Sequence, residues 1–184
     1  MIPPDARQVL TEALRPPPGT QLDRAVALTF TLDLDSALLV PLAFAGHVLR
    51  GAAEPLSVMR AARQCADRVD IFFQAGNVRV PASASDLHAV LEPMVHAVRQ
   101  PRPGRLFHPK LWAVRYRDGD SHATLLRLLV LSRNLTQDRS WDLLLRLDGA
   151  VGSRPNASNA PLGRIVRAAA GLAVTPLAPE RRTA

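Results

Sequence analysis

The sequence predicts an α/β sandwich with a central sheet. Three features favour this fold class: short runs of β-branched and aromatic residues, apolar residues at helical spacing between them, and three closely spaced strand-like segments in the second half. The chain has 184 residues, of which 47% are hydrophobic and 21% are charged. It is therefore long enough for one domain with a proper core, and its composition is that of a globular protein.

Helices and strands alternate in the first half. Asp35 or Ser36 is the expected N-terminal cap of an apolar helix that contains Pro41 and runs toward His47 and Arg50. In chain order, the other expected elements are a helix at residues 5–15 that ends at the proline-rich turn 16–19, a buried strand at residues 26–32, a helix at residues 55–66, a strand at residues 69–74, a turn at Gly76 and Asn77, and a short extended piece at residues 78–80.

The second half is richer in strands. Apolar residues at three- and four-residue spacing predict an amphipathic helix over residues 85–99, with His88 and His96 at its surface or edge. Three strands are expected at residues 106–117, 124–131 and 141–147, and the turn residues 118–121 join the first two. A linker-like stretch after Gly149 leads to a modest helix at about residues 162–172.

Cysteine content and apolar patterning favour a cytoplasmic protein. Cys65 is the single cysteine, so no intrachain disulfide forms and a reducing compartment is expected. The N-terminus lacks the pattern of a secretory signal. The most apolar stretch, residues 25–46, is interrupted by Asp33 and Asp35, which argues against stable insertion in a membrane.

Positive charge is concentrated in the second half. Residues 1–98 have a net charge of −2, whereas residues 99–184 have a net charge of +9. A basic face of this kind suits a polyanion, so nucleic acid is the expected partner; an arginine-rich composition with solvated faces is the alternative.

Lys110 is the single lysine beside twenty-two arginines, and it follows His108 by two residues. Side chains alternate along a strand, so both would lie on one face and could contact the same phosphate. A lysine is a compact charge that can meet one phosphate oxygen. Ser132 and Asn134 follow the next expected strand and would emerge at the same edge, which adds a hydroxyl and an amide around a tetrahedral anion.

The motif His108-Pro109-Lys110, followed by Ser132-Arg133-Asn134, resembles the HxK and SxN signature of the phospholipase D superfamily. The resemblance covers roughly residues 22–150. It implies an α/β/α sandwich with a central mixed sheet and hydrolysis of phosphodiesters through a phosphohistidine, with no cofactor and no metal.

Site residues follow from this resemblance by position. His108 would be the nucleophile and Lys110 the phosphate clamp, while Asn134 would hold a phosphate oxygen and Ser132 would be a neighbouring donor. Asp142 either orients the imidazole or is a strand-edge carboxylate paired with an arginine. The sequence departs from the family pattern at Arg115, where an acid is expected, and at Leu131, where glycine is usual.

The resemblance also implies a domain organisation and a missing partner. Residues 1–20 would form a helix and a proline-rich turn, residues 21–150 a phospholipase D-like catalytic half-domain, and residues 151–184 a linker-like tail with a short helix. The family builds its active site from two half-sites and this chain has one, so we expect a homodimer or a second phospholipase D-like half. The implied function is a metal-independent nuclease acting on DNA or RNA. The alternative is a non-catalytic nucleic-acid-binding or assembly domain that keeps the fold.

Overall fold

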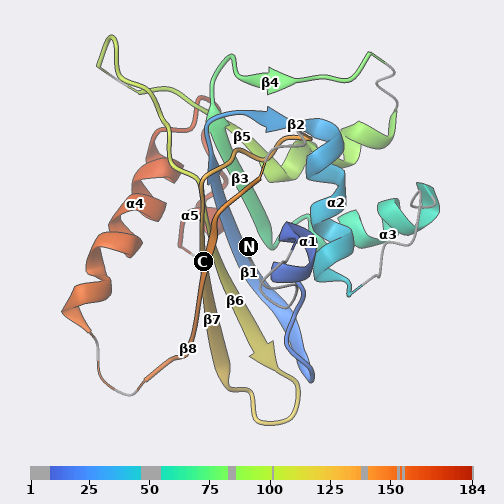
Figure 1. Ribbon diagram of the computed structural model, residues 1–184, viewed down its shortest axis with the longest axis vertical. Helices are drawn as coiled ribbons and strands as arrows, with labels where there is room; N and C mark the ends of the chain where they lie inside the picture. The colour runs from blue at the N-terminus through green and yellow to red at the C-terminus, as the bar shows by residue number, and fades with distance from the viewer. Residues whose placement is uncertain are drawn as a thin grey trace.

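A six-stranded mixed sheet forms the centre of the molecule in the computed structural model, which describes residues 9–46, 55–82, 86–100, 102–137, 141–152, 154 and 156–183 (Figure 1). The strands are β1 (Thr20–Thr29), β3 (Val69–Gln74), β5 (Val95–Val98), β6 (Leu111–Asp118), β7 (Thr124–Leu131) and β8 (Leu144–Ala150). Their order is β5-β3-β1-β6-β7-β8. The pairs β1–β3 and β3–β5 are parallel, whereas β1–β6, β6–β7 and β7–β8 are antiparallel.

The first face of the sheet carries the larger part of the core. It is covered by α1 (Leu10–Ala13), α2 (Leu34–Phe44), α3 (Pro55–Cys65) and the 3₁₀ helix η2 (Asp86–Met94). Buried side chains from these helices pack against alternate strand residues such as Trp112, Val114 and Leu129. Short parallel strands β2 (Leu32–Asp33) and β4 (Val78–Arg79) form a second, two-stranded sheet.

The C-terminal residues cover the part of the second face that is formed by β1, β3 and β5. Here α4 (Ala160–Gly171), which follows the short 3₁₀ helix η3 (Ala157–Asn159), lies on the opposite side of the sheet from α2 and α3 (Figure 1). Its Ala169 and the later Leu177 join Leu28, Phe72 and Val98 in a smaller core cluster. A last helix, α5 (Pro179–Thr183), follows. The expected α/β architecture with a central mixed sheet flanked by helices is therefore confirmed.

The predicted amphipathic helix over residues 85–99 is wrong. Residue 85 lies outside the described residues, residues 86–94 form η2, and residues 95–98 form the edge strand β5. Pro93 cannot donate a backbone hydrogen bond, which favours an end to regular helix there, and Val95 and Val98 suit a strand beside β3.

The two histidines of this segment are also placed differently from the prediction. Both side chains are largely buried, and each contacts a carboxylate that is remote in sequence. His88 Nε2 lies 3.0 Å from Asp35 Oδ1, and His96 Nε2 lies 2.8 Å from Asp70 Oδ1.

Several element boundaries differ from those expected. Asp33, rather than Asp35 or Ser36, caps α2, because its side chain accepts hydrogen bonds from the backbone of both residues. The strand expected at residues 26–32 is β1, which starts at Thr20, and the strand expected from residue 106 starts at Leu111. Of the helix expected at residues 5–15, residues 10–13 are helical and residues 5–8 lie outside the described part. Residues 47–50, the expected end of the next helix, also lie outside it.

Several elements lie within a few residues of where the sequence places them: the helices at residues 55–65 and 160–171, the strand at residues 69–74 and the β6–β7 hairpin.

Among the described residues, no helix has both the length and the apolar character needed to cross a membrane.

Candidate active site

The candidate residues lie at one edge of the central sheet. Since β1, β3 and β7 run in one direction and β6 and β8 in the other, the carboxyl ends of the first three meet the starts of the last two. In open α/β sheets, ligands bind at the carboxyl ends of the parallel strands. This edge is therefore the natural place for a site.

His108 and Lys110 precede β6 and share one side of the chain. Lys110 Nζ lies 3.2 Å from His108 Nδ1 and 3.3 Å from Nε2, and the His108 side chain is exposed. A ring nitrogen accepts a hydrogen bond from an ammonium only in the neutral imidazole, which is also the form that can attack an electrophile. The pair thus places an imidazole ring and an ammonium within 3.3 Å of each other at this edge.

Two neighbouring strands hold the His108 segment. Gln74, at the end of β3, accepts a hydrogen bond from the backbone N–H of Phe107 through Oε1 at 2.7 Å. The Phe107 side chain is buried in the smaller core cluster. Phe30, just after β1, contacts the His108 ring with a centroid distance of 4.6 Å. These contacts fix the backbone before the histidine and limit where its ring can lie.

Asn134 is brought to the same edge by β1. Its Oδ1 accepts a hydrogen bond from the Phe30 N–H at 3.3 Å, so Phe30 contacts both Asn134 and His108. The next residue is held as well, because Leu135 N donates to Thr29 Oγ1 at 3.1 Å and Leu135 O accepts from Asp33 N at 2.9 Å. With Oδ1 engaged, the amide group of Asn134 is left as a donor.

Ser132 and Asp142 contact each other at the start of β8. Asp142 Oδ1 accepts from Ser132 Oγ at 2.6 Å, from Ser132 N at 3.0 Å and from Arg133 N at 3.1 Å. Ser132 Oγ also accepts from Leu143 N at 3.0 Å. Asp142 therefore stabilises the turn that carries Ser132 and Asn134, and the Ser132 hydroxyl must exchange partners before it can donate to a phosphate.

Partial burial of Lys110 affects its charge. Desolvation of the ammonium lowers the pKa of Lys110 below its usual 10.5. A cation with weakened hydration is better placed to interact with an anionic ligand than a fully solvated one. It also loses its proton at a lower pH than an exposed lysine.

The two departures from the family pattern have structural counterparts. The Arg115 guanidinium binds the Asp23 carboxylate of the neighbouring strand, and this carboxylate neutralises the positive charge of Arg115. Arg115 lies five residues beyond Lys110, roughly 16 Å along the strand, and so outside the immediate site. Leu131 contributes its backbone N–H to Lys110 O at 3.0 Å.

Thr29, Phe30 and Gln74 are positioning residues that the sequence did not single out. Their partners lie between 33 and 106 residues away, so no local pattern links them. The sequence signal for these residues is that they come at the carboxyl ends of apolar strands. The carboxyl ends of parallel strands lie together at one edge of a sheet, where ligands bind.

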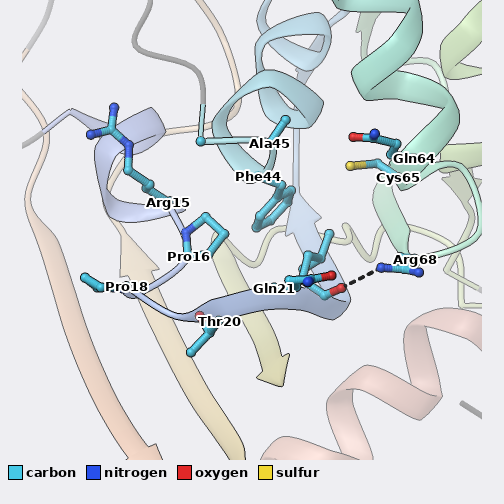
Figure 2. A pocket seen from close by; sticks show the side chains of 12 residues that line it. Arg15, Pro16, Pro18, Thr20, Gln21, Phe44, Ala45, Gln64, Cys65 and Arg68 are labelled. Carbon is cyan, nitrogen blue, oxygen red and sulfur yellow. Dashed lines mark hydrogen bonds between the residues drawn. The ribbon is translucent and has the colours of Figure 1, made fainter. Parts of the chain in front are cut away.

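Two cavities at opposite ends of β1 differ greatly in volume. The cavity beside Lys110 and Asn134 measures about 10 Å³, the space of roughly one water molecule. A cavity of about 730 Å³ lies instead at the other end of β1, where Figure 2 shows residues such as Arg15, Thr20, Phe44 and Cys65 around it. The described residues include no cluster of His, Cys, Asp and Glu side chains suited to a metal ion.

Similarity to a known protein is found at the level of structure. No model of a known family matches the chain, and no curated protein matches its sequence. Among solved structures, a yeast tyrosyl-DNA phosphodiesterase mutant is similar over 68% of this chain, with 17% identity and a TM-score of 0.39. The chain spans 24% of the length of that protein. This TM-score is too low for the likeness to carry an assignment of family or function.

Proposed function

We propose that this chain provides one half-site of a metal-independent, phospholipase D-like phosphodiesterase that cleaves nucleic acid through a covalent intermediate on His108. The observation that carries the proposal is the pairing of His108 and Lys110. An exposed imidazole lies 3.2 Å from the ammonium of the single lysine, at the carboxyl edge of the sheet, where Asn134 offers an amide donor. Nucleophile, cation and donor are the groups that phosphoryl transfer requires.

The proposed reaction has two steps. A ring nitrogen of neutral His108 attacks phosphorus, so that an N–P bond forms and the bond to the leaving oxygen breaks. Lys110 and the Asn134 amide stabilise the charge on the non-bridging oxygens. The leaving oxygen takes a proton from the histidine of the second half-site. That histidine then removes a proton from water, which attacks phosphorus and breaks the N–P bond.

A nucleic-acid substrate is supported by charge. The net charge of +9 lies in residues 99–184, which also contain the site. Exposed arginines at positions 99, 102 and 105 lead directly to His108 along the chain. Cations on such a segment can contact the phosphates on either side of the one that reacts.

Cleavage of labelled DNA and RNA in EDTA tests the proposal. His108→Ala is expected to abolish cleavage, whereas His122→Asn is the matched control. His122 is an exposed histidine in the β6–β7 turn, and asparagine tolerates its positive φ of 57°. With a substrate that is cleaved slowly, the wild type is expected to carry a phosphate-derived adduct on His108. This adduct should survive an alkaline quench and be lost in an acid quench. Cleavage that persists in His108→Ala, or that requires magnesium, would overturn the mechanism.

A non-catalytic nucleic-acid-binding or assembly role is the second candidate. It is favoured by the Ser132 hydroxyl, which is already engaged by Asp142 and Leu143. In that case the wild type binds DNA in a salt-dependent way, forms no adduct at His108 and cleaves nothing in EDTA. Trapping the adduct rejects this candidate.

A further inference from the structure

The cavity of about 730 Å³ at the start of β1 has no part in the proposed function. Its volume lies within the roughly 300–1,000 Å³ that is typical of sites for small molecules. Gln21 lines this cavity and Thr29 lies beside the His108 edge, so the two places are near opposite ends of β1, roughly 25 Å apart. A small ligand in this cavity would therefore not contact His108.

The cavity carries positive charge. Arg15, which follows α1, and Arg68, which precedes β3, both line it. Among the described lining residues, none is an aspartate or a glutamate. Cys65 also lines the cavity, but burial raises the pKa of its thiol to about 11, and the charge of Arg68 opposes this shift only in part. The thiol is therefore neutral at pH 7 and leaves the two guanidinium charges uncompensated.

Both arginines have hydrogen-bond donors left for a ligand. Nε of Arg15 is buried and has no hydrogen-bond partner among the described residues. The Arg68 guanidinium donates from Nη1 to Leu22 O at 3.0 Å, which uses one of its five N–H groups. A buried donor without an acceptor is unfavourable in the free protein, and an anionic ligand would supply the acceptor.

The two guanidinium groups lie on opposite sides of the cavity (Figure 2). Arg68 reaches Leu22 O on β1, whereas the backbone of Arg15 is held from β7, where Arg127 Nη1 donates to Arg15 O at 2.9 Å. Strand β6 lies between β1 and β7, so these points of attachment are two strand spacings apart, roughly 10 Å. A matching ligand is therefore elongated and carries an anionic group at each end.

The wall between the guanidinium groups offers apolar surface. Figure 2 shows the Phe44 ring and Pro16 in this part of the cavity. The proline-rich turn is fixed in place, because Thr20 donates to Pro17 O through N at 3.0 Å and through Oγ1 at 2.8 Å. A methylene chain or a flat ring gains free energy by burial against such a wall, and a preformed wall does not have to be ordered on binding.

We propose that this cavity binds an elongated organic dianion, which is a small molecule with an anionic group at each end and an apolar middle. Arg15 binds one anionic group and Arg68 binds the other, while the apolar part lies along Phe44 and Pro16. This site is separate from the His108 edge and does not depend on the chemistry proposed there.

Isothermal titration calorimetry with linear dicarboxylates tests the charge and the length of the ligand. Dodecanedioate is expected to bind one per chain and more tightly than succinate, which is too short to reach both arginines. Dodecanoate, with one carboxylate on the same chain, should bind more weakly than dodecanedioate by about tenfold or more, because it lacks one charge-assisted contact. Decane-1,10-bisphosphonate distinguishes phosphate-like from carboxylate ends. Absence of saturable binding by both long dianions, or equal affinities for dodecanedioate and dodecanoate, overturns the proposal.

Substitution of each arginine locates the binding site. Arg15→Gln and Arg68→Gln are each expected to abolish the advantage of dodecanedioate over dodecanoate. Arg63→Gln is the matched control, because Arg63 is an exposed arginine of α3 outside the lining, and it should keep that advantage. Lys110→Gln should keep it as well. Loss of the advantage in Lys110→Gln, with its persistence in Arg15→Gln, would place the ligand at the His108 edge and overturn the proposal.

Urea unfolding of the ligand-free protein separates binding from a structural role of Arg15. Arg15→Gln removes a buried donor that has no acceptor among the described residues, so the free energy of unfolding is not expected to fall. A variant that unfolds at a lower urea concentration and still binds dodecanedioate as the wild type does would assign Arg15 to the fold and overturn the proposal.

Discussion

Lys110 combines a positive charge with partial burial, and this combination makes a pH-dependent test possible. Because desolvation lowers its pKa below the usual 10.5, the ammonium is expected to be lost on the alkaline side before an exposed lysine would titrate. Lys110→Arg keeps the charge to higher pH, since a guanidinium does not deprotonate in this range. The alkaline decline of kcat/KM for cleavage in EDTA should therefore move to higher pH in Lys110→Arg.

Lys110→Gln completes this test. It removes the charge and is expected to lower kcat by about 10²- to 10³-fold at neutral pH, the usual effect of deleting one group that stabilises charge in the transition state. An alkaline limb that is identical in the wild type and Lys110→Arg would show that another group titrates there.

Gln74 illustrates a positioning role that is separate from chemistry. Gln74→Met keeps the side-chain length but leaves the Phe107 N–H without its acceptor at 2.7 Å, which should lower the free energy of unfolding by about 1–3 kcal/mol. The His108 segment should also become less ordered, so kcat should fall while KM changes little. Urea unfolding and steady-state kinetics measure the two effects. Gln64→Met, at an exposed glutamine of α3, is the control, and an equal loss in both variants would refute the positioning role.

At the level of elements, the sequence predicted where helices and strands lie better than it predicted which segments contact each other. The two-residue spacing of His108 and Lys110 correctly placed both on one side, even though the strand begins only at Leu111, because extended backbone alternates in the same way. The prediction for residues 95–98 was wrong because these residues form a strand by pairing with β3, which is remote in sequence. Phe30 and Gln74 could not be identified for the same reason: the topology of the sheet, and no local motif, brings them to His108.

The C-terminal helix α5 is attached to the sheet by a buried carboxylate. Asp70 on β3 binds Arg181 at 2.7 Å, Arg24 at 2.6 Å and His96 at 2.8 Å, and its side chain is 2% exposed. Burial alone would raise the pKa of Asp70, but the hydrogen bond to His96 and the charges of Arg24 and Arg181 outweigh it and hold the pKa below its usual 3.8.

Asp70→Asn is expected to lower the free energy of unfolding by about 3–5 kcal/mol at pH 7, because it leaves two largely buried guanidinium groups without their carboxylate. For an acid with a lowered pKa, the stabilisation is fully present above pH 3.8 and is lost as the pH falls through the lower native value. The variant should therefore lose less stability than the wild type between pH 4 and pH 2. Asp120→Asn, at an exposed carboxylate in the β6–β7 turn, is the control. Equal urea midpoints for both variants would contradict the role of Asp70.

At the level of the whole molecule, the charge distribution governs binding whether or not the chain is catalytic. The basic residues of the second half lie on the segments that precede and follow His108, whereas the first-face helix α3 carries exposed arginines far from it in the sequence. Binding that releases counterions from phosphates weakens as the salt concentration rises. The slope of log K against log salt concentration is proportional to the number of phosphates contacted. The slope can therefore distinguish a directed contact from general attraction by the net charge of +7.

Arg105, three residues before His108, is expected to contribute one such contact. In a His108→Ala background, which leaves DNA uncut, the affinity for duplex DNA should fall steeply between about 50 and 200 mM NaCl. Adding Arg105→Ala should reduce the magnitude of the slope of log K against log salt concentration by about 0.9. Arg63→Ala, at an exposed arginine of α3, removes the same charge and should leave the slope unchanged. Fluorescence anisotropy gives both slopes, and equal decreases for the two variants would mean that DNA has no preferred orientation relative to the His108 edge. A decrease confined to Arg105→Ala would place a bound phosphate within a few residues of the proposed nucleophile, where cleavage requires it.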